Sequence, residues 1–134
     1  MERPIQREVE IILIRRWASY ITQPIFLIGA DGELLYYNEA AGALLGRDYD
    51  ESGSMMADHL SEIFATVTEE GSPLPAESLP IVRALRNREA AHGFLRFVGL
   101  DGVIRNIEVT ALPLTGQAGR FLGVLTAFWE VDAK

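Results

Sequence analysis

Cysteine and histidine, the side chains most often used for metal binding and nucleophilic chemistry, are scarce in this sequence. It contains no cysteine and two histidines, His59 and His92. Without cysteine the chain has no disulfide, no thiolate metal ligand and no thiol nucleophile. The two histidines lie thirty-three residues apart with no clustered partner, which does not match the spacing of a zinc site. We therefore predict no metal site.

Other stretches that could do chemistry lack the required spacing. The acidic run at 48–51 does not have the Asp-x-Asp-x-Asp-Gly pattern of a calcium loop and is typical of a solvated loop. The serine in 53–55 is not in the Gly-x-Ser-x-Gly context of a nucleophile elbow. Gly29 and Gly32 belong to a predicted hairpin and not to the strand-to-helix turn that binds phosphate. No catalytic residue is predicted.

Length and composition predict a single globular domain. The chain has 134 residues, of which 49% are hydrophobic and 23% charged, and its net charge is −7. A chain of this length can bury a substantial core, and its acidity disfavours binding to nucleic acid. The longest apolar run in the first third, residues 11–14, is far shorter than the ~20 residues of a membrane span. No signal-peptide pattern is present, so we expect a cytoplasmic protein.

The first secondary-structure element that the sequence predicts is a helix over residues 4–21. Its apolar residues recur at helical spacing, but on more than one side of the helix. A helix that is apolar on more than one side usually has more than one packing partner. Pro24 ends this segment.

Two Asp-Gly pairs mark predicted β-hairpins. Asp31-Gly32 and Asp101-Gly102 each lie between two β-type apolar runs. A two-residue Asp-Gly turn needs a positive φ, which glycine adopts without strain, so we expect positive φ at both glycines. Asn38 follows the first hairpin and is a good N-cap for a short helix.

The order of elements predicts an α+β fold in which helices pack on an antiparallel sheet of five strands. The last strand is apolar on both faces, whereas a sheet with one wet face alternates. We therefore expect the N-terminal helix to cover an outward-facing set consisting of Phe94, Val98, Leu112, Val124 and Phe128. The predicted elements after that helix are strands 25–28 and 34–37, helices 39–45, 56–65 and 78–88, and strands 94–100, 103–114 and 121–131.

Three stretches resemble parts of a PAS domain. The first, PIFLIGADGELLYYNEAAGALLG, resembles its opening hairpin, asparagine and short helix, and LDGVIRNIEVTALPLTGQAGRFLGVLTAFWEV resembles its three closing strands. Between them, GSPLPAESLPIVRALR resembles the connection into the long helix that crosses the sheet. The resemblance implies a five-stranded antiparallel sheet in the order 2-1-5-4-3, with a helix-walled cavity on one face. Many members carry an N-terminal helical extension, so we expect residues 1–21 to form such a helix on the other face and 22–134 to form the PAS core.

The resemblance also bears on cofactors. Light-oxygen-voltage members bind flavin mononucleotide and form a cysteine adduct, whereas this chain has no cysteine and lacks their Asn-Cys-Arg-Phe-Leu-Gln motif. At the inward positions that hold amides for the flavin, the register places Phe97, Ile107 and Leu125, which cannot hydrogen-bond to it. Haem-binding members supply a histidine from the helix before the third strand, and here only His92 or His59 could serve. We predict no cofactor, and a haem-binding gas or redox sensor is the alternative.

The predicted inward-facing side chains are almost all apolar. They would form either the packed core of a small domain or the wall of a pocket for a small apolar molecule. The candidate pocket residues are Tyr37, Phe64, Val82, Leu85, Leu95, Phe97, Ile107, Val109, Leu125 and Ala127.

The helix over 4–21 is expected to form a homodimer, because apolar side chains left over after covering the sheet would otherwise be wet. We predict a non-catalytic sensory and interaction domain that regulates an unidentified signalling partner, with no nucleic-acid or membrane partner. A small α+β enzyme with a buried acid is a further alternative, but Glu108 is expected on the face opposite the candidate pocket. The chain ends three residues after the last strand, which favours a complete small protein. The candidate dimer residues are Val9, Ile11, Ile12, Leu13, Ile14, Trp17 and Tyr20.

Overall fold

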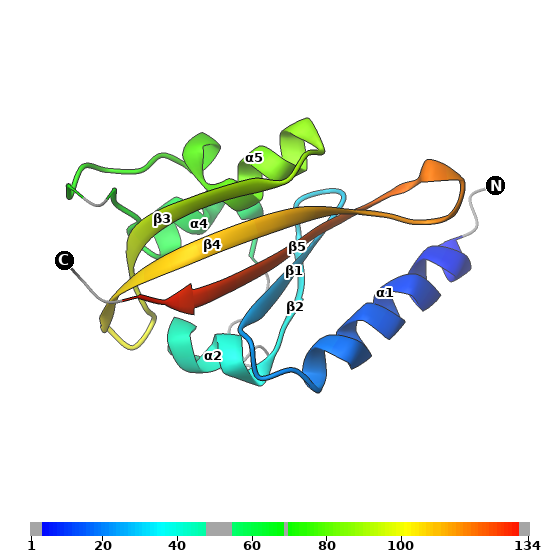
Figure 1. The fold of residues 1–134 in the computed structure, drawn as a ribbon, viewed down its shortest axis with the longest axis horizontal. Coiled ribbons are helices and arrows are strands. Elements are labelled where there is room, and N and C mark those ends of the chain that lie inside the picture. The colour runs from blue at the N-terminus through cyan, green and yellow to red at the C-terminus, as the bar shows by residue number, and fades with distance from the viewer. Residues whose placement is uncertain (1–3, 48–54, 69, 132–134) are drawn as a thin grey trace.

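The computed structural model describes residues 4–47, 55–68 and 70–131, with the backbone alone for 4–8. Five antiparallel strands form one sheet in the order β2-β1-β5-β4-β3, which confirms the order that the resemblance implied. Helices α4 and α5 lie on one side of this sheet, and α1 runs beside β2 (Figure 1). The elements are α1 (Pro4–Ser19), β1 (Ile25–Gly29), β2 (Leu34–Tyr37), α2 (Glu39–Leu45), the 3-10 helix η1 (Ala57–His59), α4 (Leu60–Ile63), the 3-10 helix η2 (Ala76–Ser78), α5 (Pro80–Asn87), β3 (Ala91–Val98), β4 (Ile104–Thr115), the 3-10 helix η3 (Gln117–Gly119) and β5 (Phe121–Glu130).

Strand register decides which side chains face the helices. On β4, Ile107 and Val109 are buried on the helix-covered inner face, and Glu108 lies between them on the outer face, as predicted. Val109 pairs with Phe128 of β5, so Phe128 also faces inward. Val124 is fully buried in the same core. The expectation that Val124 and Phe128 face outward is therefore wrong.

Both predicted hairpin glycines have positive φ, +90° at Gly32 and +83° at Gly102. The turns are nevertheless longer than two residues. A two-residue type I′ turn would need positive φ at both central residues, and neither Asp31 nor Asp101 has it. Each aspartate instead accepts a hydrogen bond from the backbone N–H two residues later, at 3.1 Å, and the following glycine takes the left-handed position of a three-residue loop.

Asn38 joins three elements at the base of the sheet. Its Oδ1 accepts from the N–H groups of Ala41 in α2 and of Ile25 in β1, each at 3.0 Å. The first of these bonds is the predicted N-cap. Its Nδ2 donates to the carbonyls of Ala18 in α1 and of two residues in the connection to β1, at 2.9–3.2 Å. This one buried side chain fixes where α1 ends and β1 and α2 begin.

Helix α1 meets the outer face of the sheet at its β2 side. Arg15 lies over the Tyr36 ring, 4.8 Å from its centroid, and Tyr36 pairs with Leu27 on the outer face. Leu27 is buried, whereas Phe94 and Leu112 on the β3–β4 side of the same face are exposed. The outer face is thus covered on one side and open on the other. Within the described residues, no helix is long and apolar enough to cross a membrane.

Candidate functional site

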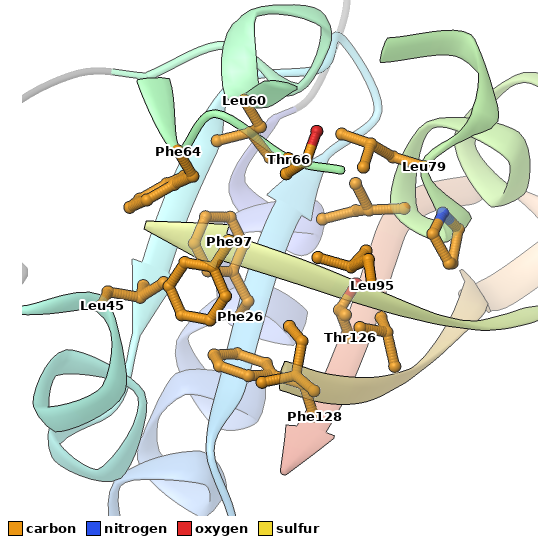
Figure 2. A pocket seen from close by; sticks show the side chains of 14 residues that line it. Phe26, Leu45, Leu60, Phe64, Thr66, Leu79, Leu95, Phe97, Thr126 and Phe128 are labelled. Atoms are coloured by element: carbon orange, nitrogen blue, oxygen red, sulfur yellow. The ribbon is translucent and has the colours of Figure 1, made fainter. Parts of the chain in front are cut away.

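A cavity of about 80 Å³ lies between the inner face of the sheet and the segments around α4 and α5. Figure 2 shows the aromatic rings of Phe26, Phe97 and Phe128 at its sheet side, with Leu60 and Phe64 opposite them. The lining residues are Phe26, Leu45, Leu60, Phe64, Thr66, Leu79, Pro80, Ile81, Leu95, Phe97, Ile107, Val109, Thr126 and Phe128.

The local structure explains how these side chains converge. Alternation along β3 and β4 turns Leu95, Phe97, Ile107 and Val109 to the same face. Pro80 begins α5, where a missing N–H costs nothing, so the helix can start at the edge of the cavity with Pro80 and Ile81 in its wall. On the inner face, Phe97 meets Phe64 edge to face, with ring centroids 5.7 Å apart.

The accessible surface of the cavity is apolar, although two of its lining residues, Thr66 and Thr126, carry hydroxyl groups. Thr66 donates its hydroxyl to the carbonyl of Leu74 at 3.0 Å. Thr126 is 4% exposed, and its Oγ1 has no hydrogen-bond partner within the described part of the chain. Among the described residues, no charged side chain lines the cavity. A wall of this kind suits a neutral apolar molecule.

The structure brings half of the candidate pocket residues to the cavity. Phe64, Leu95, Phe97, Ile107 and Val109 line it. Tyr37 and Val82 belong to the surrounding buried core, and Leu85 packs against it, but these three residues do not line the cavity.

Leu125 and Ala127 are on the wrong face in the sequence prediction. They pair with Leu112 and Thr110 on the outer side of the sheet. Because β5 is apolar on both faces, its alternation gives no clue to which face is inward. A register shift between Leu114 and Thr115, at the end of β4, also means that the inward positions of β5 cannot be counted across the loop from those of β4. This error hid Thr126 and Phe128, which are the inward residues of β5 that line the cavity.

Neither histidine lies at the cavity. His92 is on the outer face, with Nε2 2.7 Å from Oε2 of Glu108, and His59 is exposed with Nε2 3.9 Å from a carboxylate oxygen of Asp58. Glu108 is therefore also outside the cavity wall. The acidic run at 48–51 lies outside the described residues. In the described segments, no group of three or more histidine and carboxylate side chains gathers to hold a metal ion.

Helix α1 presents an apolar stripe to solvent. We define the α1 stripe as Val9, Ile12, Leu13, Trp17 and Tyr20, which are 48–80% exposed. Ile11 and Ile14 are partly buried instead. The sequence analysis placed all seven residues in one candidate interface and predicted that Ile11 and Ile14 would be among the solvent-exposed ones. The helix is rotated from that expectation, because Ala18 faces the domain and is 2% exposed.

The middle of α1 is bonded to the loop between β4 and β5. Glu10 accepts a hydrogen bond from Arg120 Nη2 and another from the backbone N–H of Gln117, at 3.3 Å. Because β5 follows this loop directly, the helix is linked to the strand that carries Thr126 and Phe128. Sequence reasoning missed this pair, since nothing local joins residues 110 positions apart.

Comparisons with known proteins agree on the fold. A family profile described as PAS fold matches residues 19–134. The chain is similar to the PAS domain of the nitrogen regulation protein NR(II) from Vibrio parahaemolyticus, with 19% identity and a TM-score of 0.62 over 89% of this chain and 98% of that one. It is also similar to the PAS domain of BvgS from Bordetella pertussis (15%, TM-score 0.65, 92% and 88%) and to one from a two-component sensor histidine kinase (17%, 0.62, 92% and 98%). A search of curated proteins by sequence finds no match.

Proposed function

The chain belongs to the PAS family, and on this premise we propose that it is a non-catalytic sensory and interaction module that forms a homodimer through α1. PAS domains are sensory modules found in signalling proteins such as histidine kinases. In this proposal the cavity binds a small apolar molecule, and the binding alters the dimer in a way that regulates a partner protein. The observation that carries the proposal is the α1 stripe, which stays exposed although α1 itself is held against the sheet.

The size of the α1 stripe supports a second copy of this chain as its occupant. Five large side chains at these exposures leave roughly 600 Å² per protomer uncovered, or on the order of 1,200 Å² for two, the lower bound of a stable specific interface. A monomer would carry this patch in water, which favours aggregation.

The open side of the outer sheet face complements the α1 stripe. Phe94, Leu112 and Trp129 are exposed there, and Glu108 lies among them. Arg16 is exposed on α1, next to the stripe, and has the opposite charge to Glu108. In a two-fold arrangement, the helix of each protomer would lie on the open sheet side of the other, so one contact is made twice.

The link between cavity and dimer runs through β5. Its inner residues line the cavity, its outer residues border the open sheet face, and the loop before it holds Glu10 of α1. An occupant that displaces β5 would therefore act on the helix through direct contacts.

Light scattering on the full chain tests the dimer. We expect twice the 14.8 kDa of one chain at micromolar concentration. Leu13→Glu, in the α1 stripe, should give a monomer with an unchanged circular dichroism spectrum. Val103→Glu is the matched control, because Val103 is also exposed but lies in the β3–β4 hairpin.

Two results would contradict the dimer. The first is a monomeric wild-type chain at high micromolar concentration, which would leave the α1 stripe for a different protein. The second is a Leu13→Glu variant that dimerises as tightly as Val103→Glu, which would place the interface elsewhere.

A further inference from the structure

His92 and Glu108 form a hydrogen-bonded pair on the open side of the outer sheet face. His92 Nε2 lies 2.7 Å from Oε2 of Glu108. An ionised carboxylate only accepts hydrogen bonds, so Nε2 carries the proton of this bond. The two side chains are 48% and 24% exposed, which leaves both within reach of a second molecule. The pair is negative when His92 is neutral and has no net charge when His92 is protonated.

Strand register places this pair within the proposed dimer contact. Phe94, Glu108 and Trp129 are cross-strand neighbours on β3, β4 and β5. Phe94 and Trp129 are exposed, so Glu108 lies between two aromatic residues that face solvent. The ring of His92 also meets the ring of Phe94 edge to face, with centroids 5.4 Å apart. A second protomer that covers these aromatic residues therefore covers the pair as well.

The arginines around His92 keep a constant charge, because they stay protonated at all ordinary pH values. On the outer face of β3, Arg96 lies four residues farther along, and its Nε donates to Oδ1 of Asn106 at 3.1 Å. From α5, Arg83 Nη2 donates to the backbone carbonyl of His92 at 2.9 Å. Three outward residues of β5 opposite this part of β4 are uncharged: Leu125, Ala127 and Trp129. Protonation of His92 is thus the change in charge expected on this surface as the pH falls from 8 to 6.

On the basis of the proposed homodimer, we propose that the His92–Glu108 pair makes it pH-sensitive, so that the dimer is tight when His92 is neutral and weakens when His92 gains a proton. Dimerisation would bring Arg16 of the second copy to Glu108. With His92 neutral, this cation meets a net negative charge and is attracted. With His92 protonated, it meets a neutral pair with a positive imidazolium beside it. Because dimerisation disfavours the protonated form, acidification disfavours the dimer by the same factor.

Overall charge predicts the opposite trend. Each chain carries a net charge of −7 at pH 7, so two protomers repel one another, and acidification lowers this repulsion. Without a specific group, the dimer would therefore become tighter as the pH falls. A dimer that weakens between pH 8 and pH 6 requires a group at the interface that gains a proton in this range. Histidine ordinarily does so, and the chain has only His59 and His92.

The dissociation constant of the dimer, measured by light scattering on a dilution series of the full chain at pH 8 and pH 6, tests this inference. We expect a value about tenfold higher at pH 6, since each of two symmetric contacts weakens about threefold, as for a partly exposed ion pair. His92→Gln should stay near the wild-type pH 8 value at both pH values. Glutamine can still donate to Glu108 but does not gain a proton.

Two further variants identify the groups involved. His59→Gln is the matched histidine control and should keep the tenfold effect, because His59 is exposed on η1 and lies nearest to Asp58, not to Glu108. Arg16→Gln removes the cation, so it should weaken the dimer about tenfold at pH 8 and leave less than a threefold difference between the two pH values. Circular dichroism at both pH values shows that each variant is folded.

The outcomes separate this inference from the proposed dimer. A dimer that Leu13→Glu disrupts, but whose affinity is the same or higher at pH 6, would overturn the pH regulation and keep the interface. A pH effect that persists in His92→Gln, or that disappears in His59→Gln, would overturn the role of His92. A wild-type chain that is monomeric at pH 8 would overturn both the dimer and its regulation.

Discussion

Replacing Asn38 with alanine tests whether one side chain holds α1, β1 and α2 together. Asn38 is 2% exposed; its Oδ1 accepts two hydrogen bonds, and the two hydrogens of its Nδ2 are shared among three carbonyl oxygens. Losing the N-cap of α2 costs about 1 kcal/mol. Nδ2 has two hydrogens for its three carbonyl acceptors, so one bond at the N–H of Ile25 and two at the carbonyls are also lost, each at up to about 1 kcal/mol where water cannot enter. We expect a total of about 3–4 kcal/mol, a large fraction of the stability of a small domain.

Urea denaturation followed by circular dichroism measures this loss. Asn38→Ser is the matched variant, because serine can cap α2 but cannot reach the carbonyls at the end of α1. We expect Asn38→Ser to recover about 1 kcal/mol relative to Asn38→Ala. If Asn38→Ala costs less than 1 kcal/mol, or if the two variants are equally stable, the assignment of these hydrogen bonds as the junction of the fold is wrong.

Three other substitutions test backbone strain at two glycines and the ion pair between Glu10 of α1 and Arg120. Gly102→Val should cost about 1 kcal/mol from positive φ alone, since no atom lies within 4 Å of an added Cβ, and an unchanged thermal midpoint would contradict the turn assignment. Gly123→Ala should cost about 3 kcal/mol in urea denaturation, because its Cβ would clash with the carbonyl oxygen of Ile28 and φ is +145° at this position. A smaller loss than for Gly102→Val would refute this. Glu10→Gln should cost about 0.5 kcal/mol at low salt, because its ion pair with Arg120 is partly exposed, and this difference should shrink in 1 M NaCl; a salt-independent loss would argue against the ion pair.

The sequence predicts the sheet well where polar and apolar residues alternate. On β4, the charged Glu108 between Ile107 and Val109 predicts that the two apolar side chains face inward and the glutamate outward, and the structure confirms this. The strand order and the positive φ of both hairpin glycines are confirmed as well. These features depend on local patterns and on the resemblance to a fold that the comparisons also find.

The candidate site is predicted less well, because its geometry depends on contacts distant in sequence. The phase of β5 follows from its pairing with β1 and β4, and no alternation within the strand reveals it. The rotation of α1 is set by the ties at Asn38 and Glu10. Thr126 was overlooked because threonine is usually exposed, and only the pairing of β5 with β1 and β4 shows that it lies on the inner face.

The central position of β5 restricts how the domain can move. The strand is paired on both edges, so sliding it along its axis would break two ladders of hydrogen bonds together. A slip of one residue would also turn Thr126 to the outer face. A change in the twist of the sheet keeps both ladders intact and rotates the long β4–β5 hairpin, which projects toward the start of α1 (Figure 1). The loop at the far end of that hairpin, which binds Glu10 of α1, then moves farther than the part of the hairpin at the cavity. A small change at the cavity wall would therefore give a larger displacement at α1.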